Sequence, residues 1–415
     1  MLAMWRAGVA AALPVNCLLG QWPETPRSRL AVIACGKAAC GMAAAAAAHF
    51  GSRCTGIVIF PESAADPCLA GLRSFPASHP VPGAGSVAAA EAALELARDL
   101  EPDDLLMVLL SGGGSALMCL PAPGLALAEK QALSRQLLGC GATIGEINCV
   151  RKHLSAIKGG RLAAASAAPV VTLAISDVPG DDPSVIASGP TVPDPSSLAD
   201  AREVLRRHGI DPAPAIWRAL ADPANETPKP DGGAAGEFRI VASGMTALRA
   251  AAEFCRAQGI EPVVLGDRLQ EDARRLASAH AARALELARN GRPLCLLSGG
   301  ETHLELGPAP GRGGRNTEYA LAMALALDGH PGIWALAADT DGIDGHGGHA
   351  GALVTPDTLG RARTRGLEPR EYLERNDSAS LFAALCGLLV EGPTGTNVND
   401  FRAILVSPER PDTAM

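Results

Sequence analysis

Short apolar runs alternate along the chain with longer alanine-rich or amphipathic segments. In the first half the continuous apolar runs predict buried strands at residues 30–34, 57–60, 105–110 and 170–175. Helices are predicted between them at residues 38–48, 88–100 and 144–156, the last from the capping pattern of Thr143 and Glu146. This alternation is typical of an α/β fold in which helices flank parallel or mixed, Rossmann-like sheets.

The second half repeats the alternation. Strands are predicted at residues 294–297, 333–338 and 403–406, and a helix at 316–327. The intervening segment 221–236 is rich in proline, glycine and charge without apolar periodicity, which is typical of a domain boundary. We therefore predict two domains, 1–235 and 236–415, with the last strand (about 396–415) a candidate to return to the first domain.

Glycine turns follow several predicted strands. LLSGGGSAL, which contains Ser111, Gly112, Gly113, Gly114 and Ser115, resembles LLSGGETHL, which contains Gly299, Gly300 and Glu301. IVASGMTAL (240–248) is a looser third copy. The patterns GxGxxG and GxxxxGK[ST] are both absent from the sequence. Glycines let several N–H groups point into one concavity, so these turns indicate ligand sites at the carboxyl ends of the strands.

Cations accompany these turns. Lys37 stands at a strand-to-helix turn, where an anionic ligand would suit the positive helix end, although a solvated surface lysine is the alternative. A second glycine cluster, Gly311, Gly313 and Gly314, carries Arg312 and Arg315. Guanidinium groups beside a nest of amides favour a phosphate or carboxylate partner.

Other basic residues are weaker candidates. His79 lies in a proline-rich loop and could be a polar group at a cleft, but a lone histidine is more often structural. Arg151, Ser155 and Lys158 share one face of the helix predicted from residue 144, and such a face is usually solvated.

Carboxylates gather where two predicted strands end. Asp177 and Asp182 follow the strand 170–175, and Asp341 follows the strand 333–338. Such clusters suit Mg²⁺, which takes one or two carboxylates and ligand phosphates, and an Asp/Gly-rich turn without metal is the alternative. Zinc bound by His303, His346 and His349 is disfavoured, because a flexible HGGH segment gives poor ligand geometry.

The overall composition narrows the class of protein. Hydrophobic residues make up 47% of the chain, and the net charge is −8 with a pI of about 5.6, which disfavours nonspecific binding to nucleic acid or a membrane surface. The 11 cysteines form no CxxC pair, which fits a reducing cytoplasm. The N-terminal segment only superficially resembles a signal peptide, since Pro14 interrupts it. The residues alone indicate an enzyme that acts on phosphates or small carboxylates.

Longer motifs carry a family resemblance from about Gly36 to the end of the chain. They are GKAACGMA, SHPVP, LLSGGGSAL, EINCVRKHLSAIKGGRLA, ISDVPGDDPSVIASGPTVPD, SGGET, GGRNTEYAL, DGIDG, AGALV and GPTGTNVNDF. In these the chain resembles the glycerate 2-kinase family, whose C-terminal part is the MOFRL domain. The resemblance implies ATP-dependent phosphorylation of D-glycerate to 2-phosphoglycerate with Mg²⁺, on a two-domain α/β fold with the site in the interdomain cleft.

The resemblance also implies roles for individual residues. Lys37 and Arg315 are expected to neutralise the transferring phosphoryl group or to hold the glycerate carboxylate. Asp177, Asp182 and Asp341 are candidates for metal binding or for the general base, and Asp177 is also counted among the catalytic residues. The expected substrate or nucleotide contacts are Ser111, Gly112, Gly113, Gly114, Ser115, His79, Arg151, Lys158, Gly299, Gly300, Glu301 and Asn316. A homodimer is a candidate assembly.

Two other functions stay open. Proteins similar to this one are also called hydroxypyruvate reductases, so an NAD(P)H-dependent reductase is one alternative, against which the missing dinucleotide fingerprint counts. A noncatalytic protein that binds a sugar acid is the other. Thr317 stands where the family usually has Gln, VEGPTGTN replaces TGPTGTN, and His346 and His349 replace small or acidic residues; these departures affect substrate detail more than reaction class.

Overall fold

The computed structural model describes residues 1–232, 236–289, 291–345 and 347–407. The chain forms two compact units, which are described separately below. The N-terminal unit comprises Cys17–Ser176 and Asp181–Val241, and the C-terminal unit comprises Met1–Asn16, Asp177–Gly180 and Ala242–Met415. His346, one of the histidines considered for zinc, lies outside the described residues.

The N-terminal unit is built on a six-stranded sheet of order β3-β2-β1-β4-β5-β6. Its strands are β1 (Leu30–Cys35), β2 (Cys54–Pro61), β3 (Leu72–Ala77), β4 (Leu105–Leu110), β5 (Val170–Ile175) and β6 (Glu237–Ala242). The pairs from β3 to β5 are parallel, and β1, β4 and β5 are buried along their whole length, as expected for strands covered on both faces. The chain order reverses between β1 and β4, so this unit has the Rossmann-like switch point that the alternation predicts.

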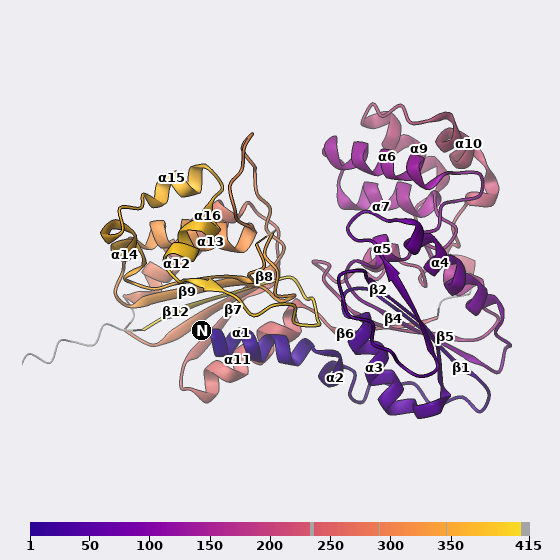
Figure 1. Cartoon of the computed structure of the whole chain (residues 1–415), viewed down its shortest axis with the longest axis horizontal. Coiled ribbons are helices and arrows are strands. Elements are labelled where there is room, and N and C mark those ends of the chain that lie inside the picture. Colours follow the sequence, from indigo (N-terminus) through magenta and orange to yellow (C-terminus); the bar gives the residue numbers. More distant parts are fainter. Residues whose placement is uncertain (233–235, 290, 346, 408–415) are drawn as a thin grey trace, which may run out of the picture. The chain divides into compact units, whose positions relative to one another are not determined.

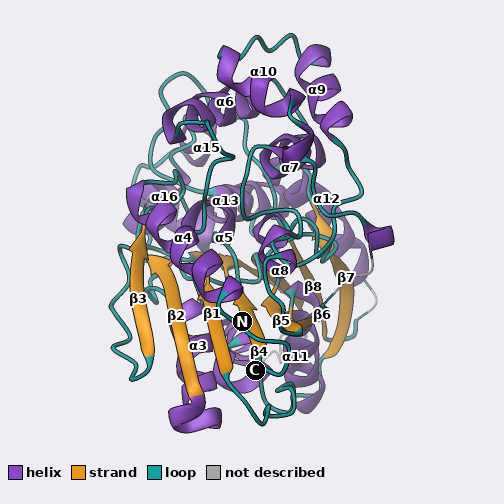
Figure 2. Ribbon diagram, turned by 90° about the vertical axis from the view of Figure 1, so that its right-hand side faces the viewer, coloured by secondary structure: helices purple, strands orange, loops and turns teal. Residues whose placement is uncertain are grey.

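Helices surround this sheet (Figure 2). They are α3 (Ala39–Phe50), α4 (Ala84–Arg98), α5 (Gly114–Leu117), α6 (Leu127–Gly139), α7 (Ile144–His153), α8 (Arg161–Ala164), α9 (Leu198–Arg207) and α10 (Pro214–Ala221), with 3-10 turns at Gly51–Arg53, Ile186–Ser188, Pro223–Asn225 and Pro230–Gly232. Helices α6, α7, α9 and α10 share a small apolar core of their own (Figure 1). The predicted capping box starts α7, with Glu146 N donating to Thr143 Oγ1 at 3.3 Å.

The C-terminal unit contains the second six-stranded sheet, of order β11-β10-β9-β12-β8-β7. Its strands are β7 (Glu261–Leu269), β8 (Leu294–Gly300), β9 (Ile333–Asp339), β10 (Gly351–Val354), β11 (Leu388–Leu389) and β12 (Asp400–Val406). β7 and β8 are parallel and the other pairs are antiparallel, so the sheet is mixed.

Two layers of helices enclose this second sheet. They are α1 (Leu2–Ala12), α11 (Gly244–Ala257), α12 (Ala273–Ala288), α13 (Arg315–Leu327), α14 (Thr358–Thr364), α15 (Pro369–Glu374) and α16 (Ser378–Ala384), and α2 (Pro14–Cys17) follows α1. Figure 1 shows α12, α13 and α16 over one face of the sheet and α1 with α11 over the other. The main core of this unit lies between α12, α13 and the strands.

Two expectations about the domains change. The last strand, β12, lies between β8 and β9 in the second sheet, so it does not return to the first domain. The first sheet also keeps β6, which begins beyond the predicted boundary at residue 235, and the compact unit built on it extends to Val241. None of the described helices is long and apolar enough to cross a membrane.

Candidate active site

Two turns meet at the switch point of the first sheet, after β1 and after β4. The Lys37 amide donates to Gly112 O at 2.8 Å, and the Ala38 amide donates to Ser111 Oγ at 3.0 Å. Gly36 has a φ of +131°, and a Cβ at this position would overlap Ser111. The close approach of the two turns therefore requires glycine at residue 36. Lys37 and the Ser111–Gly112 segment, which lie far apart in the sequence, come together where ligands bind in doubly wound sheets.

The glycine turn after β4 has amides available to a ligand. Within the described part of the chain, no hydrogen bond uses the amides of Gly112 or Gly113. A Cβ built on Gly113 would lie 3.1 Å from His79 Nε2 and 3.6 Å from Lys37 Cγ, so both side chains lie beside this turn. Three predicted elements of the site, His79, Lys37 and the glycine turn, are therefore neighbours.

Lys158 supports the same turn from within the unit. Its ammonium donates to Ser115 O at 2.8 Å and to Met118 O at 3.0 Å, and the residue is 1% exposed. The expected solvated helix face is wrong for this residue, because α7 ends at His153 and the following segment pairs with residues 120–122. Burial lowers the pKa of Lys158. Ser115 Oγ also lies 2.8 Å from Ser188 Oγ, which fixes the turn from a second side.

Arg151 lies in the last turn of α7 and is half-buried. Its backbone carbonyl accepts a hydrogen bond from Lys130 Nζ at 3.3 Å. Its guanidinium makes no hydrogen bond or ion pair with any described residue. Burial lowers the pKa of Arg151. This cation is thus partly removed from water without a counter-ion among the described residues.

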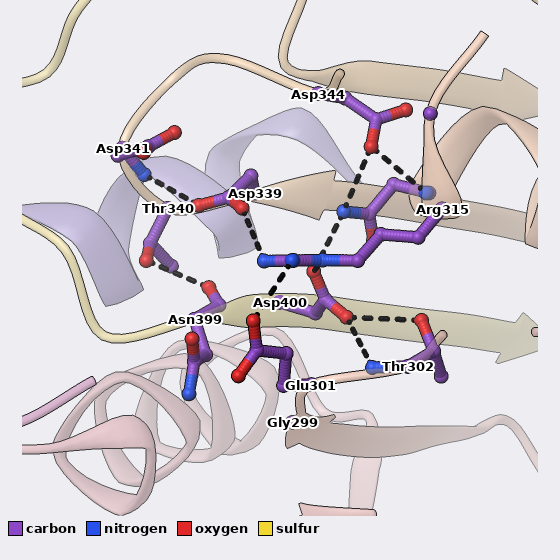
Figure 3. A network of polar contacts seen from close by, with 12 residues as sticks. Gly299, Glu301, Thr302, Arg315, Asp339, Thr340, Asp341, Asp344, Asn399 and Asp400 are labelled. Atoms are coloured by element: carbon purple, nitrogen blue, oxygen red, sulfur yellow. Dashed lines mark hydrogen bonds and ion pairs between the residues drawn. The ribbon is translucent and has the colours of Figure 1, made fainter. Parts of the chain in front are cut away.

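Arg315 is the centre of the polar site in the C-terminal unit (Figure 3). Its guanidinium donates to Asp400 Oδ1 at 2.7 Å, to Asp339 Oδ2 at 2.7 Å and to Glu301 Oε1 at 3.1 Å. Burial alone would lower the pKa of Arg315, but the charges of these carboxylates raise it. The arginine is therefore permanently charged and held from three sides, with 26% of its side chain still exposed.

Asp400 joins Arg315 to the interior of the unit. Its other oxygen, Oδ2, accepts from the Thr302 amide and hydroxyl, both at 3.1 Å, and from the Arg402 guanidinium. Burial would raise the pKa of Asp400, but Arg402 and Arg315 outweigh it and hold the pKa below its ordinary value. In contrast, burial, reinforced by the charge of Asp341, raises the pKa of Asp339. The two arginines thus favour the charged form of Asp400.

The second glycine cluster is not the open anion nest that its composition suggests. Its neighbouring amides are taken by side chains of the same unit: Arg312 N donates to Asp377 Oδ1 at 2.8 Å, and Asn316 N and Thr317 N donate to Asp344 at 3.0 and 2.8 Å. A Cβ on Gly314 would overlap the Asp344 carboxyl. These glycines therefore allow internal carboxylates to approach and cap α13, whose first residue is Arg315.

Asp177 and Asp341 are both connected to the loop before β12. Asp177 Oδ2 accepts from Asn397 Nδ2 at 3.0 Å, and its carbonyl accepts from the Asn399 side chain. Asp341 follows β9 and accepts through its carbonyl from Thr394 N at 3.1 Å. Both residues are half-buried. The loop 394–399 therefore positions two of the three acids predicted to bind metal.

The third predicted ligand, Asp182, lies in the N-terminal unit, where it is exposed and caps Ser184 N at 2.8 Å. Among the residues that the structure describes, no group of three His, Cys, Asp or Glu side chains is arranged to hold a metal ion. His349 is buried, and neither of its ring nitrogens forms a hydrogen bond with a described residue; its Nε2 lies 3.9 Å from Asp344 Oδ2.

Comparison with known proteins places these features in a family. The MOFRL family matches residues 294–400, and a domain of unknown function (DUF4147) matches residues 1–221. The D-glycerate 2-kinase of Thermotoga maritima is 37% identical over 95% of this chain and 95% of its own length. The chain belongs to the glycerate kinase family.

Two further likenesses bear on this family. A crystal structure of glycerate kinase from Thermotoga maritima has a TM-score of 0.90 and 36% sequence identity, covering 97% of this chain and 98% of that one. A protein of Agrobacterium vitis, whose name gives hydroxypyruvate reductase as a provisional activity, is 49% identical over 97% of this chain and 93% of its own length. The protein is an enzyme of the glycerate kinase family, and its α/β fold with two units agrees with that of the solved relative.

Several residues of this family member's site were not singled out from its sequence. They are Asp339, Asp344, Asn397, Asn399, Asp400 and Arg402. Most lie within motifs that carried the resemblance, DGIDG and GPTGTNVNDF, but no local pattern marks one acid as the partner of Arg315. Asp400 pairs with Gly300 and with Asp339 in the sheet, and this register brings its carboxylate to the arginine.

Proposed function

We propose that this enzyme catalyses the ATP-dependent phosphorylation of D-glycerate to 2-phosphoglycerate. The observation that carries the proposal is the combination, in one chain, of an open glycine turn beside Lys37 and an acidic site built around Arg315. Phosphoryl transfer needs amides and cations for the phosphates and carboxylates for a divalent cation. The curated Thermotoga maritima relative, named D-glycerate 2-kinase, supports this substrate.

The residues would divide the work as follows. Lys37 would neutralise charge on the phosphoryl group, and the amides of Gly112 and Gly113 would hold an anionic group of the bound molecules. Arg315 would stabilise the transferring group or the glycerate carboxylate through its exposed edge. The carboxylates around Arg315 keep the guanidinium in one orientation, which lowers the entropic cost of using it.

Asp177 and Asp341 would hold Mg²⁺ and one of them would accept the proton of the substrate hydroxyl. A pair of acids fits this ion, because Mg²⁺ is usually held by one or two carboxylates together with substrate phosphates. Burial raises the pKa of Asp339, and the charge of Asp341 raises it further. The carboxylates of Asp339 and Asp341 therefore repel each other, and a bound cation would relieve this repulsion. When bound, the ion would supply charge neutralisation at the phosphates. Asp339 is a poor base, since both of its oxygens already accept hydrogen bonds.

Hydroxypyruvate reduction is the second candidate function. The 49% identical Agrobacterium vitis relative favours it through its name. The absence of the GxGxxG pattern argues against it, because that pattern holds the pyrophosphate of a nicotinamide cofactor in Rossmann-type enzymes. The cytoplasmic location and the homodimer stay predictions from the sequence.

A coupled assay separates the functions. The purified protein is expected to consume ATP only when D-glycerate is present, and not to oxidise NADH or NADPH with hydroxypyruvate. Replacing Lys37 or Arg315 by Ala is expected to lower kcat by about 10²-fold or more, as for other groups that stabilise charge in the transition state. Arg312→Ala is the matched control, because Arg312 is an exposed arginine in the same segment as Arg315. The kcat of this variant should stay near that of the wild type. Turnover with nicotinamide but not ATP would reject the kinase.

A further inference from the structure

Three cations lie near one another in the N-terminal unit, and one of them, Lys158, holds the carbonyl of Ser115 in the glycine turn. We call Lys130, Arg151 and Lys158 the cation cluster. Lys130 Nζ donates to Leu154 O at 2.6 Å and to the carbonyl of Arg151, while Lys158 Nζ donates to the carbonyls of Ser115 and Met118. Burial lowers the pKa of Lys130, and the charges of Lys158 and Arg151 lower it further, so the three cations lie near one another.

No carboxylate of the described residues forms a hydrogen bond or an ion pair with these three cations. Lys130 is 5% exposed and Lys158 is 1% exposed, and all the acceptors that they contact among the described residues are neutral carbonyls. The other buried lysine of this segment, Lys152, has a carboxylate partner in Asp194 at 3.3 Å. A buried cation without a counter-ion costs several kcal/mol, and such a cost is offset when an anion binds beside it.

The turn that Lys158 holds supplies the other half of an anion site. The amides of Gly112 and Gly113 make no hydrogen bond within the described part of the chain. The guanidinium of Arg151 has no hydrogen-bond or ion-pair partner among the described residues either, and Arg151 is the member of the cluster that keeps contact with solvent. Amide donors and uncompensated cations thus occur together in this unit.

The site in the C-terminal unit has the opposite balance. Arg315 is shared by Glu301, Asp339 and Asp400, and the only other cation among their partners is Arg402, bound to Asp400 within the described residues. An anion with several charges would meet more carboxylates than cations here, and at the cation cluster it would meet cations whose described contacts are neutral carbonyls. A divalent cation suits the first site, and a polyanion suits the second.

We propose that the cation cluster and the glycine turn bind the polyphosphate chain of the phosphoryl donor, so that the N-terminal unit is the nucleotide-binding unit. Arg151 contacts a phosphate directly. Lys130 and Lys158 are positioning residues: they hold the carbonyls of the turn and of the end of α7 without touching the ligand. The identity of the polyanion as a nucleotide rests on the proposed kinase function, whereas its charge follows from the cluster alone.

The test is a calorimetric titration of the full-length protein with inorganic tripolyphosphate. The wild type is expected to bind this probe, and Arg151→Gln is expected to weaken binding by about tenfold or more, as for loss of a charge-assisted hydrogen bond. Lys158→Met is expected to weaken it as well. Arg207→Gln is the matched control, because Arg207 is an exposed arginine of the same unit whose partner is Glu146. Its affinity should match that of the wild type.

Two outcomes would overturn the proposal: no binding by the wild type at millimolar probe, and equal affinity of wild type and Arg151→Gln for the probe. The second outcome can be accompanied by a raised KM for D-glycerate in Arg151→Gln. The last result would assign the cluster to the carboxylate substrate. Since Arg151 is half-buried and its side chain has no hydrogen-bond or ion-pair partner in the part of the chain that the structure describes, Arg151→Gln decides the question even if Lys158→Met does not fold. The titration needs no turnover, so its result is independent of whether ATP is consumed with glycerate.

Discussion

Lys130 gives the sharpest test of the electrostatics of the N-terminal unit. It lies on α6, is 5% exposed, and burial lowers its pKa to about 7. An ordinary lysine has a pKa near 10.5. Replacing it by Met removes the charge while keeping a long unbranched side chain, at the cost of leaving the carbonyls of Leu154 and Arg151 without this donor.

The expected effect depends on pH. Below pH 7 Lys130 is protonated in both the folded and the unfolded chain, so the folded protein bears the whole cost of the buried charge. Between pH 7 and 10.5 the unfolded chain binds more protons than the folded one, and the free energy of unfolding rises with pH by up to ~1.4 kcal/mol per unit. Between pH 7 and 10.5 the free energy of unfolding of the wild type is expected to rise by about 5 kcal/mol through Lys130. The Lys130→Met variant should not show this rise.

The measurement is urea denaturation of both proteins at several pH values from 6 to 9.5, with unfolding monitored by circular dichroism. The difference in unfolding free energy, wild type minus Lys130→Met, is expected to increase steadily above pH 7. Leu133→Met, a change on the same helix without a titratable group, should differ from the wild type by a constant amount of less than about 1.5 kcal/mol. A difference for Lys130→Met that is flat from pH 6 to 9.5 would refute the inference of a buried, uncompensated lysine.

Three further predictions concern the C-terminal unit and the metal. Asp400→Asn is expected to destabilise the fold by about 3–5 kcal/mol in urea denaturation, because it removes one partner of a fully buried ion pair, whereas Asp328→Asn, at an exposed residue, should change stability by less than ~0.5 kcal/mol. Gly314→Ala is expected to lower the melting temperature through a clash with Asp344 worth about 1–3 kcal/mol; Gly360→Ala, on an exposed helix position with open space, should not lower it. Removal of divalent cations with EDTA is expected to abolish ATP consumption and added Mg²⁺ to restore it, while persistent turnover would contradict a metal-dependent reaction.

Much of the architecture could be predicted from local patterns. The strands β4 and β5 coincide with the apolar runs 105–110 and 170–175, because strands buried on both faces need continuous hydrophobic residues. The capping box of Thr143 and Glu146 marked the start of α7. Its end was misplaced, because residues 154–156 bond to the segment 120–122, a partner that no local pattern reveals.

The residues of the candidate site could also be predicted in part from local patterns. Lys37, the glycine turn and Arg315 could be named from residue type and position next to predicted strands and helices. Their surroundings could not: a solvated face was the alternative for Lys158, which is buried, and an anion nest was expected at the glycines before α13, where Asp344 and Asp377 bind instead. In both cases the partners lie far away in the sequence.

The sequence by itself determined which segments become strands and helices, because hydrophobic periodicity and capping act over a few neighbouring residues. Only the tertiary structure decided which charges meet. Asp400 reaches Arg315 because β12 pairs between β8 and β9, and Lys158 reaches Ser115 because the chain after α7 returns to the turn behind β4. Compensation of a buried charge depends on distance in space, and sheet register and loop closure bring distant residues to that distance.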